Sequence, residues 1–173
     1  MALLTSTLTL LALGPVDGSD LSTAHAAKTS QHSLLQSRQL WATVNLCNPK
    51  DKPNWIGIRG SMPGDGHPGE RMYMRFRVQY RDANTGRWVD VAQGADSGFL
   101  ALGAATRARQ SGHSFQLVPA PGKSAFELRG TVSYQWRRGT HVVHSVSRTT
   151  TAGHRSLAGA DPPGFTAATC TLS

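Results

Sequence analysis

"ERMYMRFRVQYRD", Glu70 to Asp82, is the stretch that decides the fold class of this chain. Its side chains alternate strictly, and a period of two is the pattern of a β-strand with one buried and one wet face. The even positions are predicted to face a core, and they carry Met72, Met74, Phe76, Val78 and Tyr80. The odd positions are predicted to face water, and they carry Arg71, Tyr73, Arg75, Arg77, Gln79 and Arg81.

Other stretches alternate in the same way, and turn-forming residues separate them. "AFELRGTVSYQWRR", Ala125 to Arg138, is the clearest, and "DANTGRW" predicts a hairpin that pairs 71–81 with 87–92. Further strands are predicted over 40–47, 55–60, 98–103, 114–119, 141–151 and 165–173, without a helical period of useful length. The chain is therefore predicted to be all-β, an antiparallel two-sheet sandwich of about eight or nine strands.

The N-terminal part is predicted to be an export signal. Residues 1–27 contain an apolar run over 3–13, too short to span a bilayer, and the small-residue sequence "AHA" at 24–26. No basic residue precedes the run, so a non-cleaved anchor or a disordered leader is the alternative. Residues 28–39 are predicted to be a linker and residues 40–173 the β-sandwich domain, secreted to the exterior of a bacterial envelope.

The chain is basic, with 18 Lys and Arg against 10 Asp and Glu among 173 residues. Removing 1–27 takes two aspartates away and leaves a net charge of +10. Such a charge favours anionic partners such as cell-wall polymers, lipid headgroups or nucleic acid, although no nucleic-acid-reading motif occurs. The arginine-rich, lysine-poor composition of a GC-rich genome is the other explanation.

Cys47 and Cys170 are the two cysteines of the chain, and neither belongs to a CxxC pair. A zinc site built on cysteine pairs is therefore not expected. In an oxidising compartment two cysteines most simply form one disulfide, which here would join the start of the domain to its end. Two buried free thiols are the alternative.

No catalytic motif is found: GxSxG, HExxH and the phosphate-binding GxxxxGK[ST] are all absent. His141 and His144 are three apart, which on a regular strand means opposite faces, so they are not expected to share a metal unless a bulge intervenes. Asp65 and Glu70 lack the acidic spacing of a calcium loop. "GHRS", 153–156, is either a catalytic dyad or a hydrogen-bonded turn. We therefore expect no metal, no cofactor, and a non-catalytic protein rather than an enzyme. Most acidic residues are assigned to loops: Asp51, Asp65, Asp82, Asp96 and Asp161.

The arginine row is the candidate binding site. Planar guanidinium groups match phosphate and carboxylate oxygens, so a row of them with a tyrosine suits an anionic polymer. Arg129 and Arg137 would extend the row if their strand is a neighbour. The alternatives are that Glu127, Asp90 and water satisfy the arginines one by one, or that they protect a sheet edge from aggregation. The candidate binding residues are Arg71, Tyr73, Arg75, Arg77 and Arg81.

"YQWRRGTHVVHSVSRTT", with tyrosine and tryptophan two apart before a tight turn, resembles strands of immunoglobulin-like and fibronectin-III-like sandwiches. The region 40–173, with "RMYMRF", "GHRS" and cysteines near both ends, also resembles small secreted proteins of actinobacteria. These resemblances imply export and a β-sandwich but no activity. Antibody-type domains join two mid-domain strands, whereas these cysteines lie at the two ends.

The function expected from the sequence is that of a secreted, non-catalytic β-sandwich that binds an anionic component of the envelope, a cell-wall polymer or a membrane surface. The alternatives are an accessory module that binds another protein and, less favoured, a small secreted hydrolase.

Overall fold

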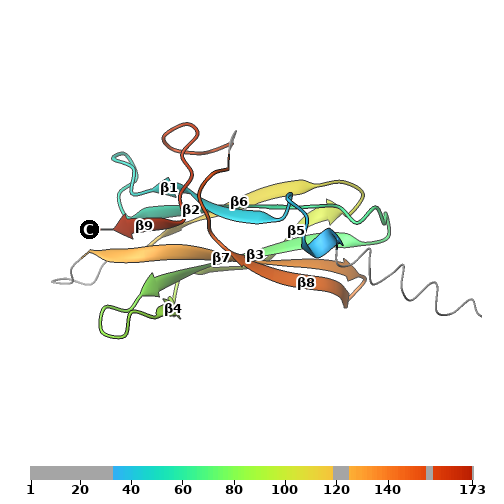
Figure 1. The fold of residues 1–173 in the computed structure, drawn as a ribbon, viewed down its shortest axis with the longest axis horizontal. Coiled ribbons are helices and arrows are strands. Elements are labelled where there is room, and N and C mark those ends of the chain that lie inside the picture. The colour runs from blue at the N-terminus through green and yellow to red at the C-terminus, as the bar shows by residue number, and fades with distance from the viewer. Residues whose placement is uncertain (1–32, 119–124, 155–157, 173) are drawn as a thin grey trace, which may run out of the picture.

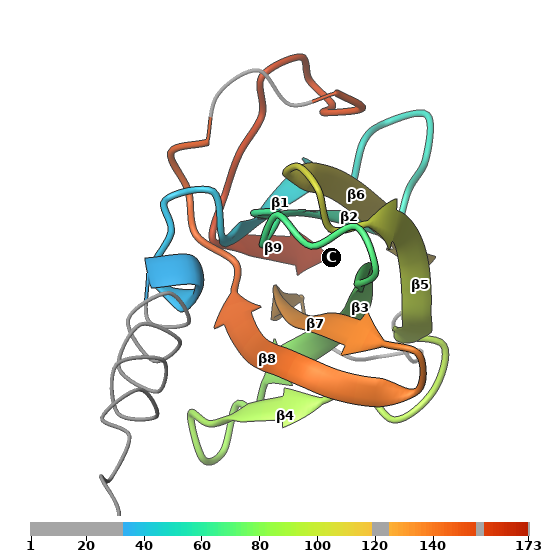
Figure 2. The ribbon, with the colours of Figure 1, turned by 90° about the vertical axis from the view of Figure 1, so that its right-hand side faces the viewer.

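Two antiparallel β-sheets, one of three strands and one of six, stack face to face (Figures 1 and 2). The structure is a computed structural model that describes residues 33–118, 125–154 and 158–172. The predicted all-β sandwich and its strand number are confirmed. The nine strands are β1 (Trp41–Cys47), β2 (Trp55–Met62), β3 (Arg71–Arg81), β4 (Trp88–Asp90), β5 (Asp96–Ala104), β6 (Arg109–Gln116), β7 (Phe126–Arg138), β8 (His141–Thr149) and β9 (Thr169–Leu172).

The six-stranded sheet is built around its two longest strands, β3 and β7, which pair along most of their length. β5 and β4 share the other edge of β3, while β8 and β9 share the other edge of β7. The predicted hairpin partner of 71–81 is therefore only partly present. β4 pairs with three residues of β3, from Gln79 to Arg81, and β5 pairs with β3 from Arg71 to Arg77.

The three-stranded sheet has the order β1-β2-β6, and its strand β1 is covered on both faces. One face meets the core, and the chain before β9 runs along the free edge of β1, where Val44 pairs with Ala167 and Leu46 with Asp161 in isolated bridges. The amides of Val44 and Ala167 each donate to the other's carbonyl oxygen, at 2.9 and 3.0 Å, and the Asn45 side chain donates to the Gly159 carbonyl at 2.8 Å. The Thr43 hydroxyl likewise donates to the Ala167 carbonyl at 3.1 Å, and these side-chain contacts explain why Thr43 and Asn45 are buried although they point away from the core.

The core lies between the two sheets and consists of the side chains that the alternation assigned to it. Met72, Met74, Phe76 and Val78 of β3 are fully buried, whereas Tyr80 at the strand end is half-buried. The other large buried side chains come from both sheets and include Ile56, Ile58, Met62, Leu128, Val132, Tyr134, Trp136 and Leu172.

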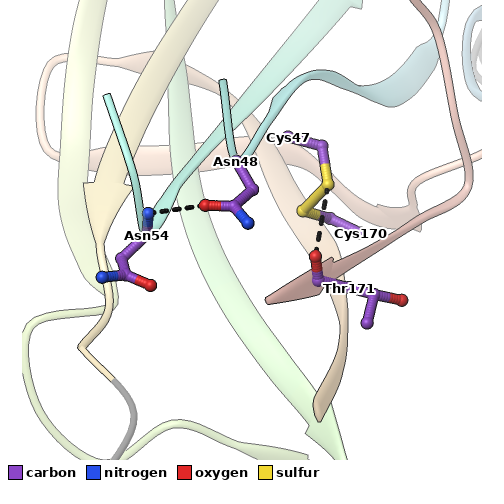
Figure 3. Close-up of a disulfide and its surroundings, with 5 residues drawn as sticks. All are labelled: Cys47, Asn48, Asn54, Cys170 and Thr171. Carbon is purple, nitrogen blue, oxygen red and sulfur yellow. Dashed lines mark hydrogen bonds between the residues drawn. A yellow bond between two sulfur atoms is a disulfide. The ribbon is translucent and has the colours of Figure 1, made fainter. Parts of the chain in front are cut away.

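A disulfide between Cys47 and Cys170 joins β1 of the small sheet to β9 of the large sheet (Figure 3). The two Cα atoms lie 5.5 Å apart, and the predicted pairing is confirmed. The turn that follows Cys47 is held by the Asn54 amide, which donates to Oδ1 of Asn48 at 2.8 Å (Figure 3). Both asparagines have positive φ, 48° and 66°, a conformation that asparagine adopts more readily than most residues.

Within the expected linker, residues 33–35 form a single helical turn, and Leu34 and Leu35 pack against the core. The predicted export signal over 1–27 lies outside the described residues. In the part of the chain that is described, no helix has the length and apolar character needed to cross a membrane.

Candidate anion-binding face

The arginine row of β3 lies on the outer face of the six-stranded sheet. Arg71, Tyr73, Arg75, Arg77 and Arg81 all occupy odd positions of β3, whose even positions are buried in the core or, at Tyr80, half-buried. β7 lies beside β3, with Arg129 opposite Gln79 and Arg137 opposite Arg71. The predicted extension of the row onto a neighbouring strand is therefore present.

The middle of the row is neutralised by carboxylates from the surrounding strands. Arg75 forms a bidentate ion pair with Asp96, and Arg77 lies 3.3 Å from Asp90. Arg81 lies 3.3 Å from Glu127. The hydrogen bonds from Arg75 lower the pKa of Asp96 and raise the pKa of Arg75 itself. Three of the five predicted binding residues thus already have an internal counterion.

The sequence predicts a loop at Asp96, and this prediction is wrong, because Asp96 is the first residue of β5. The strand starts two residues before Gly98, whose positive φ of 63° marks an irregularity. The register between β3 and β5 shifts between Arg75 and Arg77, so Asp96 reaches both arginines. Asp90 and Glu127, which the sequence suggested as counterions, do pair with Arg77 and Arg81.

At the Arg71 end of the row, Arg137 contacts aromatic rings rather than a carboxylate. The guanidinium carbon of Arg137 lies 4.4 Å from the ring centroid of Tyr73 and 4.6 Å from that of Phe99, within the range of cation–π contacts. Arg71 lies directly opposite Arg137. Neither Arg71 nor Arg137 forms an ion pair with any described residue. We call Arg71, Tyr73, Phe99 and Arg137 the basic end of the face.

A second arginine stacks on an aromatic ring further along the face. The guanidinium carbon of Arg129 lies 4.4 Å from the Trp88 ring centroid, and its Nε donates to Oε1 of Gln79 at 2.8 Å. Partial burial lowers the pKa of Arg129. Phe99 and Trp88 were not among the predicted site residues. The alternation of 98–103 could have placed Phe99 on one face of a strand, but only the pairing of β5 with β3, which sets Phe99 opposite Arg75, brings it against the Arg137 guanidinium.

The histidine pair and the "GHRS" turn are the two sequence features with a possible metal-binding or catalytic role. β8 has one extra residue between His144, which pairs with Trp136, and His141, which pairs with Arg138. This bulge brings both histidines to the side of even-numbered β7 residues, so the expected opposite faces are not found. His154 stacks on the Trp41 ring at 4.4 Å, and its burial lowers its pKa. Residues 155 and 156 of "GHRS" lie outside the described residues.

Two further features of the described residues could hold a ligand: a cluster of metal-ligating side chains and a hollow at the end of the sandwich. Asp65, His67 and Glu70 come together in the loop between β2 and β3, with donor atoms within 4.8 Å of one another. A hollow of about 1020 Å³ lies at the end of the sandwich near the β3–β4 turn, lined by apolar Val91, Leu117, Val118, Phe126 and Leu128 together with polar turn residues.

No protein-family model and no curated protein sequence matches this chain. Among solved structures, the chain is similar to an alkylpurine DNA glycosylase, AlkC of Pseudomonas fluorescens, bound to DNA containing an abasic site analog. The sequence identity is 13% and the TM-score 0.33, over 77% of this chain and 40% of the glycosylase chain. A similarity this slight supports no argument about fold or function.

Proposed function

We propose that this protein is a secreted, non-catalytic β-sandwich whose outer sheet face binds an anionic polymer of the cell wall at the basic end. One observation carries the proposal: Arg71 and Arg137 lie opposite each other on neighbouring strands and form no ion pair with a described residue. Arg75, Arg77 and Arg81, which already have carboxylate counterions, then stabilise the sheet and do not contact the polymer.

The chemistry of the basic end suits phosphate or carboxylate groups spaced along a chain. Directly opposite residues of an antiparallel pair have Cα atoms about 4.5–5.5 Å apart, so two guanidinium groups can bind one anionic group or two adjacent ones. Stacking on Tyr73 and Phe99 restricts the Arg137 side chain, and its Nε and Nη2 both donate to Oε1 of Gln135. An anion would therefore be bound through the remaining N–H groups of the planar guanidinium, those of Nη1 among them.

Export is the second part of the proposal. It is supported by the apolar run over 3–13 with "AHA" at 24–26 and by a disulfide, which persists in oxidising compartments. A net charge of +10 without residues 1–27 also favours retention at an anionic surface.

The test compares two double variants that remove the same charge from the same face. We expect R71Q/R137Q to weaken retention on insoluble cell wall by at least about tenfold, since each charged hydrogen-bond contact contributes about 1.5–3 kcal/mol. R75Q/R77Q, which removes the ion-paired arginines, should stay within about twofold of wild type. Binding is measured by co-sedimentation at several salt concentrations, with vesicles of anionic lipid as a parallel arm.

Equal losses in the two double variants would mean that overall charge, not the basic end, retains the protein. Unchanged retention in R71Q/R137Q would contradict the proposal outright. Sedimentation with vesicles but not with cell wall would replace the polymer by a membrane surface.

A protein partner is the second candidate, and the apolar lining of the hollow at the sandwich end favours it. Val118, which lines this hollow, is an exposed large apolar side chain of the kind that protein partners cover. A Val118→Asp variant would abolish such an interaction while leaving cell-wall retention unchanged, which separates the two candidates.

A further inference from the structure

The loop between β2 and β3 brings three metal-ligating side chains into one cluster. Asp65, His67 and Glu70 each offer one donor atom, and all of these atoms lie within 4.8 Å of one another. Their spacing of two and three residues matches no calcium loop, which is why the sequence did not suggest a site there.

The loop holds these side chains in place through backbone contacts. The Trp136 indole N–H donates to the Pro63 carbonyl at 3.1 Å, and the Ala105 amide donates to the Glu70 carbonyl at 2.9 Å. A Cβ at Gly64 would lie 2.6 Å from the Ala105 carbonyl oxygen, so only glycine permits this close approach. The cluster therefore stands on a fixed backbone rather than on a loose tip.

The two carboxylates have buried oxygens without a partner. The side chains of Asp65 and Glu70 are only 5% and 2% exposed. Oδ2 of Asp65 and Oε2 of Glu70 have no hydrogen-bond partner among the described residues. The His67 amide binds Oδ1 of Asp65 at 2.7 Å, and Arg138 binds Oε1 of Glu70 at 2.7 Å, so each carboxylate keeps one oxygen for a ligand. Buried unpaired carboxylate oxygens are costly, and a cation between them would remove that cost.

We propose that Asp65, His67 and Glu70 bind a divalent transition-metal ion of the Zn²⁺ type. Two carboxylates and one imidazole form a mixed oxygen and nitrogen donor set. Calcium and magnesium favour oxygen donors, whereas imidazole favours zinc and its neighbours in the first transition row. Three protein ligands leave at least one position to water.

The surroundings provide access for the ion and further donors. The His67 side chain is 64% exposed, so one side of the cluster opens to water. A hollow of about 340 Å³ beside the loop is lined by Asp65, His67 and His144. The β8 bulge turns His144 to this side, and its buried Nδ1 has no partner among the described residues.

Among the described residues outside the cluster, Arg138 is the one that forms an ion pair with it, and this pair does not prevent metal binding. Its side chain is 67% exposed, so water screens its charge. It contacts Oε1 of Glu70, whereas the free oxygen is Oε2. The ion pair with Arg138 can therefore persist when the metal binds.

The test is isothermal titration calorimetry of the full chain, made without a histidine tag, with Zn²⁺ as the probe and Ca²⁺ as the comparison ion. We expect one Zn²⁺ per chain, and D65N, H67N and E70Q should each bind at least about tenfold more weakly. The matched controls D51N and H141N change an exposed aspartate and an exposed histidine elsewhere, and they should stay within about twofold of wild type.

The H67N variant decides the proposal if a buried substitution disturbs folding, because His67 is mostly exposed. Circular dichroism of the metal-free variants identifies any that are unfolded. The proposal is overturned if wild type gives no saturable Zn²⁺ binding, if H67N binds Zn²⁺ as wild type does, or if Ca²⁺ binds more tightly than Zn²⁺.

Discussion

Tyr134 shows at the residue scale how the two sheets are tied together. Its side chain is fully buried in the core, and its hydroxyl donates to the Trp41 carbonyl of β1 at 2.5 Å. Alternation in the sequence places Tyr134 inward, but it does not reveal that the hydroxyl bridges to the opposite sheet. Burial raises the pKa of Tyr134, because a phenolate would lose its hydration there.

Tyr134→Phe removes this bridge and leaves the Trp41 carbonyl without that donor. We expect the free energy of unfolding to fall by about 1 kcal/mol at neutral pH, as measured by urea denaturation. A loss below the error of the measurement would mean that water replaces the hydroxyl.

The raised pKa of Tyr134 also predicts a pH dependence. Above the ordinary tyrosine pKa, about 10, the unfolded chain releases the proton while the folded protein retains it. The unfolded state then binds fewer protons, so stability falls as the pH rises beyond that value. We expect Tyr134→Phe to show a smaller alkaline loss of stability than wild type in urea titrations between pH 8 and about 11.

The one glycine within strand β7, Gly130, is needed where the strand packs against the opposite sheet. A Cβ at Gly130 would lie 2.7 Å from Ile58 Cδ1 of β2 and 2.7 Å from Thr150 Cγ2. The strand passes the opposite sheet at this point with no room for a methyl group. The sequence shows Gly130 only as an inward position that lacks a side chain.

Gly130→Ala is expected to destabilise the protein by about 1–3 kcal/mol, because the added methyl overpacks the core. Gly69→Ala is the matched control, since its Cβ would meet nothing within 4 Å. Thermal unfolding of both variants measures the difference. Equal melting temperatures for the two would show that Ile58 moves aside without cost.

β6 is the element that sequence reasoning located least well. It begins at Arg109, whereas the apolar pattern indicated a strand only from 114. Residues 109–114 read "RQSGHS" and contain no apolar side chain, so neither periodicity nor β-propensity marks them. They are strand because β2 pairs with them in register, from Met62 with Arg109 to Trp55 with Gln116.

At the scale of the whole molecule, the disulfide closes a loop of 123 residues between the first and last strands. Cross-linking the ends of so long a loop removes much conformational entropy from the unfolded chain and so stabilises the folded state. C47A/C170A should therefore lower the free energy of unfolding by about 4–5 kcal/mol on the chain-entropy model. Urea denaturation of this variant beside oxidised wild type measures the loss. A loss under about 1 kcal/mol would show that the contacts of β9 with β7 keep the chain ends in place without the disulfide.

The sequence by itself determined the all-β class, most strands, the inward faces of β3 and β7, and the outward arginines, because side-chain direction alternates locally along each strand. Only the tertiary structure decided which arginines have counterions and that Phe99 joins Tyr73 and Arg137. It also brought the buried oxygens of Asp65 and Glu70 beside His67. These outcomes depend on strand pairing, register and bulges between segments far apart in the chain, and local alternation carries no information about them.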